Sequence, residues 1–173
     1  MFKGLIKLIV FILLVGVFVF NFTYALKSFY FSNKPAGEGR MLVQAPLRTV
    51  SWEDIGKVSD PVLDAKVKTI DGWEKTSFLL DSGAVISSLP REMADKMGLE
   101  LVFLKRIAFV GFGNSESFAY QGEMTLAVQE SELTLPVVFT ESYGTRSILG
   151  RKGFFDEYVI TFDKKRGVVE IKE

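Results

Sequence analysis

The chain of 173 residues contains no cysteine and no histidine. Without cysteine there is no disulfide, no thiol nucleophile and no Cys-ligated zinc site. Without histidine, a Ser-His-Asp triad and His-ligated metal sites are excluded as well. Any hydrolytic chemistry must therefore use Asp, Glu, Lys, Ser or Tyr side chains, and we expect neither a metal nor another cofactor.

The chain also lacks an excess of charge of either sign. Its 21 Lys and Arg residues balance its 21 Asp and Glu residues. Proteins that bind nucleic acid usually carry a basic face. Nothing in the charge therefore indicates a nucleic-acid partner.

One unbroken apolar run begins at Leu8 and continues to Phe20, and the segment extends through Asn21, Thr23 and Tyr24 to Leu26. Its length of about 19 residues corresponds to roughly 28 Å of helix, close to the ~30 Å hydrocarbon core of a bilayer. Phe22 and Tyr24 lie where an interfacial belt of aromatic residues is expected. We therefore expect residues 1–26 to form an N-terminal, single-pass transmembrane helix that anchors the chain.

The alternative for this segment is a cleaved signal peptide. Lys3 and Lys7 would be its charged start, and Thr23, Tyr24 and Ala25 its exit site. The apolar run is long for a signal peptide, which favours the retained anchor.

The charges that flank the run give little indication of its orientation. Lys3 and Lys7 favour an N-terminus inside the cell, whereas Lys27, Lys34 and Arg40 on the other side weaken that bias. We favour an exterior or periplasmic location for the remainder of the chain.

After the anchor, residues 27–48 read as a linker, because 32–39 are rich in turn formers and have little apolar periodicity. Residues 49–173 read as one mostly β domain. Asp71-Gly72, a strong hairpin signal, separates strands expected at 64–70 and 74–80. Pro90 and Gly98 mark the start and stop of a short helix. Further strands are expected at 107–110, 118–121, 123–129, 133–140, 158–162 and 168–171, with a second short helix at 151–157. Many short strands with regular turns predict a small β-barrel or sandwich.

Two motifs in this domain carry chemistry. The apolar stretch 78–80 runs directly into Asp81, Ser82, Gly83 and Ala84. A carboxylate at the end of a buried strand, in a tight Ser-Gly turn, suits a catalytic acid held in a protected cleft. A second motif follows much later and consists of Ile148, Leu149, Gly150 and Arg151. Between the two motifs lies a glycine-rich loop with Gly111, Phe112, Gly113 and Asn114.

In the order and spacing of these motifs, residues 60–173 resemble the retropepsin-like aspartic proteases, the family of retroviral proteases and their single-domain cellular relatives. The resemblance implies an all-β fold, a small closed barrel of the retropepsin-like acid protease type with one or two short helices. It implies that Asp81 is catalytic and that Ser82, Gly83 and Ala84 form the active-site turn. The glycine-rich loop is then the flap over the substrate, with Gly111, Phe112, Gly113 and Asn114, and Ile148, Leu149, Gly150 and Arg151 support the site.

The resemblance also implies an endopeptidase that works as a homodimer, and the apolar run adds the expectation that a membrane anchor holds it. The chain has one Asp-Ser-Gly only, so the second carboxylate must be Asp81 of a partner chain. Two carboxylates a few Å apart share one proton, and the pair activates a water that attacks a peptide bond.

The sequence departs from the family pattern after the active-site turn. Family members often have an acidic residue where Val85 and Ile86 stand, so Arg151 lacks the expected ion-pair partner. We expect Ser87 and Ser88 to satisfy backbone groups near the active-site turn.

A different class of function fits the same residues. The domain would then be a catalytically inactive, membrane-tethered β-barrel that binds extended peptides by strand addition. Such a module would tolerate Asp81→Asn, whereas a protease would lose turnover and keep its fold.

Overall fold

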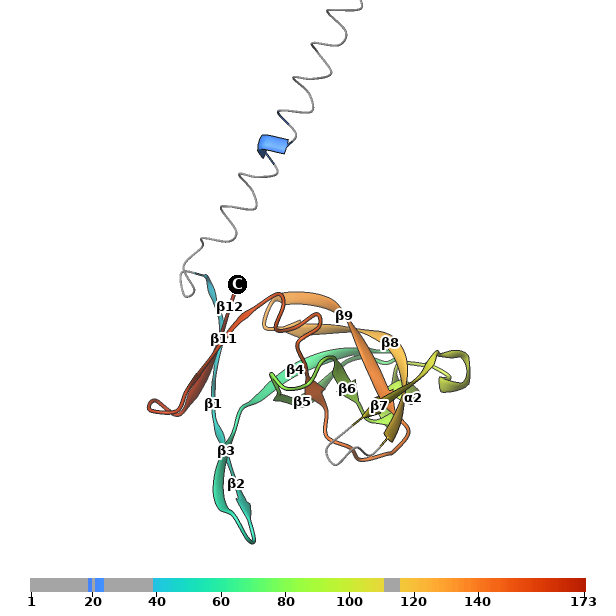
Figure 1. Cartoon of the computed structure of the whole chain (residues 1–173), viewed down its shortest axis with the longest axis horizontal. Helices are drawn as coiled ribbons and strands as arrows, with labels where there is room; N and C mark the ends of the chain where they lie inside the picture. The colour runs from blue at the N-terminus through green and yellow to red at the C-terminus, as the bar shows by residue number, and fades with distance from the viewer. Residues whose placement is uncertain (1–18, 20, 24–38, 111–115) are drawn as a thin grey trace, which may run out of the picture. The chain divides into compact units, whose positions relative to one another are not determined.

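A computed structural model describes residues 19, 21–23, 39–110 and 116–173 (Figure 1). The chain divides into two units, Met1–Glu38 and Gly39–Glu173. In the first unit, Val19 and residues 21–23 are helical, and the Thr23 hydroxyl donates to the Val19 carbonyl at 2.9 Å. Among the described residues no helix has both the length and the apolar character needed to cross a bilayer. Most of the expected anchor 1–26 and of the expected linker 27–48 lies outside the described residues, so the anchor stays a prediction.

The second unit is built around a closed barrel, which confirms the expected all-β fold. Its strands follow one another around the barrel in the order β4, β5, β10, β6, β9 and β8, and pairing of β8 with β4 closes it. A further strand, β7, continues the sheet beyond β8. These strands span Val62–Thr69 (β4), Gly72–Leu80 (β5), Ser87–Leu89 (β6), Arg106–Val110 (β7), Glu116–Val128 (β8), Ser131–Thr140 (β9) and Ile148–Leu149 (β10).

Apolar side chains at alternate strand positions fill the barrel. In β4, Leu63, Ala65 and Val67 are buried while the residues between them are exposed, as the twofold repeat of a strand requires. Phe78 and Phe139 are fully buried in the same core. The hairpin expected around Asp71-Gly72 is confirmed, with Thr69 opposite Gly72.

A second sheet is formed by the two ends of this unit, in the order β1, β12, β11. The strands are β1 (Met41–Pro46), β12 (Val168–Lys172) and β11 (Val159–Asp163). Val169 and Ile171 of β12 are buried in the core cluster. Strand β1 occupies part of the stretch expected to be a linker, so the strand-forming region begins before residue 49.

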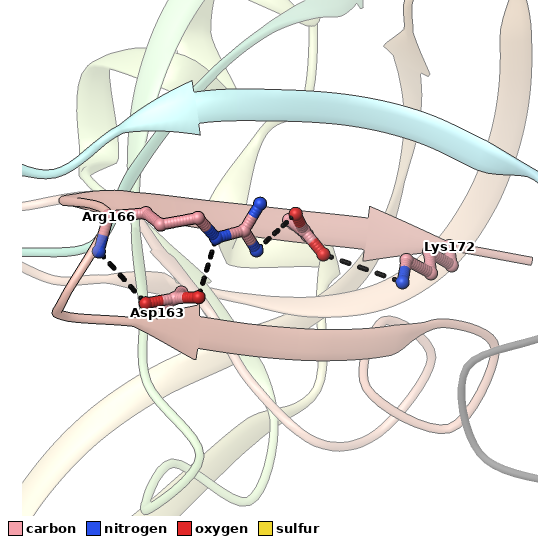
Figure 2. A network of polar contacts seen from close by, with 4 residues as sticks. Asp163, Arg166 and Lys172 are labelled. Carbon is pink, nitrogen blue, oxygen red and sulfur yellow. Dashed lines mark hydrogen bonds and ion pairs between the residues drawn. The ribbon is translucent and has the colours of Figure 1, made fainter.

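Charged side chains on this sheet hold the turn between β11 and β12, as Figure 2 shows. The guanidinium of Arg166 contacts the carboxylates of Asp163 and Glu170, at 2.6 Å each. Lys172 lies 3.4 Å from the other oxygen of Glu170. The hydrogen bonds from Arg166 hold the pKa of both carboxyl groups below their usual range. The Glu170 side chain is buried under these contacts.

Among the described residues, the strands β2 (Arg48–Trp52) and β3 (Gly56–Asp60) pair with each other alone, in a separate two-stranded ribbon (Figure 1). No strands were predicted from the sequence at these positions.

The helix expected from Pro90 to Gly98 is confirmed as α2 (Arg91–Lys96), with Pro90 at its N-cap. A 3-10 helix, η1 (Leu101–Phe103), follows. The helix expected at 151–157 is wrong, because this stretch forms successive turns. Gly153 there has a φ of +88°, which a right-handed helix does not accommodate.

Candidate active site

Asp81 directly follows strand β5, and the fold fixes its backbone from two sides. The Asp81 N–H donates to the Leu149 carbonyl at 3.0 Å. One residue earlier, the Leu80 N–H donates to the Pro61 carbonyl at 2.9 Å. Leu80 itself is buried in the core. The carboxylate therefore stands at the end of a strand that is bonded on both edges.

The turn after Asp81 orients its side chain. The Gly83 N–H donates to Asp81 Oδ1 at 2.8 Å, and the Ala84 N–H donates to the Asp81 carbonyl at 3.2 Å. Asp81 is half-buried, whereas Ser82 and Gly83 are exposed. The turn thus presents an anchored carboxylate at the surface of the single chain.

The second motif lies alongside this turn, as the sequence predicted. Strand β10 runs parallel to β5, with Leu149 opposite Leu80, and antiparallel to β6, with Ile148 opposite Ser88. The Arg151 N–H donates to the Ala84 carbonyl at 2.9 Å. Residues far apart in the sequence are thereby joined by main-chain hydrogen bonds.

Gly150 lies close to the backbone of Ala84 and Ile86, at and just after the active-site turn. A Cβ atom at this position would lie 2.6 Å from the carbonyl carbon of Ile86 and 3.0 Å from the Ala84 oxygen. These contacts are backbone atoms, so no side-chain movement relieves them. The Gly150 N–H donates to the buried hydroxyl of Ser87 at 3.1 Å. The expected role of Ser87 in satisfying the backbone is confirmed.

Arg151 contributes its backbone but not an ion pair. Its side chain is exposed and forms no ion pair with any of the described residues. Val85, which stands where the family often has an acid, is 60% exposed. The chain has no acidic residue at Val85, and Arg151 accordingly has no ion-pair partner among the described residues.

The expected flap residues 111–114 lie outside the described residues. Their flanking strands are described: β7 and β8 form an antiparallel pair, with Val110 opposite Glu116. The hairpin that carries the loop is thus present, and the role of its tip stays a prediction.

One contributor to the site was missed by the sequence reading. The Pro61 carbonyl aligns the end of β5, and a backbone acceptor of this kind cannot be recognised from the side chains in a sequence.

Within the described part of the chain, no group of three or more Asp or Glu residues is arranged to hold a metal ion.

Known proteins similar to this chain are found among solved structures and not among sequences. No protein-family model matches the chain, and no curated protein matches it either. Among solved structures, the chain is similar to a retropepsin-like aspartic protease from Rickettsia conorii. The two share 18% sequence identity with a TM-score of 0.51, over 78% of this chain and 94% of that chain.

The chain has the retropepsin-like fold. It is also similar to the EIAV protease in complex with the inhibitor HBY-793, at 16% identity and a TM-score of 0.41, over 59% of this chain and 88% of that chain. In this retropepsin-like barrel, Asp81 and the second motif meet at the ends of β5 and β10.

Proposed function

We propose that the chain is an aspartic endopeptidase in which Asp81 supplies one of two catalytic carboxylates. The proposal rests on the position of Asp81 in a retropepsin-like fold. Asp81 directly follows β5, whose residues Phe78 and Leu80 are buried. Its Oδ1 accepts from the Gly83 N–H, and its own N–H donates to the Leu149 carbonyl of the second motif.

The second carboxylate comes from Asp81 of another copy. The sequence has a single Asp-Ser-Gly, and Ser82 and Gly83 are exposed on the single chain. Two copies that meet at this turn around a twofold axis place their carboxylates next to each other.

The chemistry follows from two carboxylates that share one proton. The ionised carboxylate takes a proton from a water, whose oxygen bonds to the carbonyl carbon of the peptide. The protonated carboxylate donates to the carbonyl oxygen, which yields a tetrahedral intermediate. The C–N bond then breaks as the carboxyl group that took the proton of the water delivers it to the departing amine, while the other carboxylate takes a proton from a hydroxyl of the intermediate. No metal, cofactor or side-chain nucleophile takes part in this scheme.

The anchor belongs to the same proposal. Residues 1–26 would hold the domain at a membrane, on the exterior or periplasmic side. Two anchored copies have a higher effective concentration for pairing than two free ones.

A cleavage assay tests the activity. Full-length protein in detergent is incubated with a peptide library from roughly pH 4 to 7, beside the Asp81→Asn variant. We expect products from the unmutated chain alone, with equal thermal stability of the two proteins. Equal products from both would contradict the role of Asp81. Peptide binding by both without products would favour the binding module.

A further inference from the structure

The β2–β3 ribbon has one apolar face, which is half-buried at Val50 and becomes exposed towards the tip of the ribbon. Cross-strand pairs place Val50 opposite Val58 and Trp52 opposite Gly56, while the polar residues between them face the other way. Trp52 is 52% exposed, and Ile55 at the tip is 75% exposed. An isolated two-stranded hairpin is marginally stable in water, so a ribbon of this kind needs a covering surface.

The base of the ribbon is fixed to the barrel. Arg48 at the start of β2 contacts the Asp64 carboxylate at 2.6 Å and donates to the Ser77 hydroxyl at 3.3 Å. Asp60 at the end of β3 contacts Arg146 at 2.9 Å. The tip residues Glu53 and Asp54 form no ion pair within the described chain. The ribbon therefore projects from a base that is fixed by ion pairs, and the charged residues at its tip form no ion pair with the described residues.

The ribbon leaves the barrel next to the candidate active site. Pro61, the residue after β3, bonds through its carbonyl to Leu80, and Asp81 follows Leu80. If Asp81 meets its counterpart in a second copy, the ribbon starts beside the place where that copy docks.

A cavity that runs along β3 to the base of the ribbon has the chemistry complementary to the tip. The tip combines the apolar Trp52 and Ile55 with the carboxylates of Glu53 and Asp54. The cavity has a volume of about 400 Å³ and combines four apolar residues with two lysines: Leu47, Val58, Pro61, Phe162, Lys57 and Lys164. Among the described residues, neither lysine forms an ion pair.

We propose that the β2–β3 ribbon is a dimerisation arm, whose acidic and apolar tip inserts into the basic and apolar cavity of a second copy. Under twofold symmetry, each tip reaches the base of the other ribbon, so the two ribbons lie side by side in opposite directions. Such an interface is self-complementary and closes at two copies. The inference rests on the homodimer of the proposed function and adds a contact that holds it.

Disulfide cross-linking tests the contact directly, since the chain has no cysteine of its own. One tagged full-length chain carries Asp54→Cys, and a differently tagged one carries Lys164→Cys. We expect the mixed pair to cross-link on mild oxidation. A control pair in which Glu132→Cys, at an exposed position near the start of β9, replaces Asp54→Cys should cross-link at least about tenfold less.

The outcomes separate the arm from the catalytic pairing. A protein that is dimeric by mass and cleaves peptides, but shows no selective cross-link, would overturn the arm and leave the proposed function standing. A protein that is monomeric and inactive would overturn both.

Charge reversal gives a second readout that does not require oxidation. One chain carries Glu53→Lys and Asp54→Lys, and the other carries Lys57→Glu and Lys164→Glu. Each variant alone places like charges at both contacts, and we expect its dimer Kd to rise about tenfold or more. Mixing the two makes both contacts complementary and should restore dimerisation.

The matched control is Glu130→Lys with Glu132→Lys, which changes the net charge by the same amount on exposed residues at the β8–β9 turn and near the start of β9. It should leave the Kd unchanged. Failure of the mixed pair to recover, or an equal loss in the control, would overturn the arm.

Discussion

Two tight turns in this chain, one at Asp81 and one between β11 and β12, are stabilised in different ways. The Asp81 turn is held by main-chain hydrogen bonds to Leu149 and Ala84 and by the close approach of Gly150. The β11–β12 turn is held by the ion pairs of Arg166. Main-chain bonds do not titrate, whereas ion pairs depend on pH. The main chain of the candidate active site should therefore keep its geometry under conditions that loosen the outer sheet.

The largest effect on stability should come from adding a side chain at Gly150, where there is no space for one. In Gly150→Ala, the new Cβ meets backbone atoms of Ile86 and Ala84, and we expect a loss of about 3 kcal/mol in the free energy of unfolding. Chemical denaturation of full-length protein measures it. Gly167→Ala is the control, because Gly167 has a φ of +68° but open space around it, and only the strain of about 1 kcal/mol applies. Equal losses in the two variants would contradict the packing argument.

A smaller effect should follow from removing the Ser87 hydroxyl. Ser87→Ala leaves the buried Gly150 N–H without its acceptor, which should cost about 2 kcal/mol. The neighbouring Ser88→Ala should change the stability by less than about 0.5 kcal/mol. Urea denaturation of both proteins decides between them, and an unchanged midpoint in Ser87→Ala would show that the bond does not stabilise the motif.

The smallest effect should come from the outer sheet, and it should depend on pH. Hydrogen bonds from Arg166 lower the pKa of Glu170 and of Asp163 in the folded chain. Carboxylates with a lowered native pKa stabilise the fold above their ordinary values, roughly 3.9 to 4.3, and lose this contribution as the pH falls through the lowered values.

We therefore expect Arg166→Gln to lower the melting temperature at pH 7 and to approach the unmutated protein as the pH falls below roughly 4. Lys172→Gln is the milder comparison, because Lys172 lies 3.4 Å from Glu170. Thermal melts across pH measure both variants, and a constant difference at all pH values would show that the carboxylates are not responsible.

Turn and cap residues in the sequence were sufficient to predict the first hairpin and the short helix. Asp71-Gly72 located the first hairpin, and Pro90 with Gly98 located α2, because turn and cap residues act on their own neighbours. The order of the Asp-Ser-Gly and Ile-Leu-Gly motifs carried the family resemblance, and the resemblance implied that the second motif supports the first.

What the sequence did not reveal depends on partners far along the chain. Strand β1 forms because β12 lies beside it, and residues 41–46 carry no turn or cap signal that announces this pairing. The helix expected at 151–157 failed because Gly153 adopts a positive φ, which packs it against Leu135 and Pro136 of β9. The sequence predicted that the Ser87 hydroxyl satisfies a backbone group, but only the structure identifies the Gly150 N–H as that group.

The pairing of β1 with β12 places the two ends of the folded unit 39–173 next to each other. The Glu173 N–H donates to the Arg40 carbonyl at 3.1 Å, and their side chains form an ion pair. In topological terms the path of this unit is nearly a ring. A short glycine linker from Glu173 to Arg40, with new ends opened at Glu130 in the β8–β9 turn, would give a circular permutant. Its strands would follow a new order along the chain while every strand pair is kept.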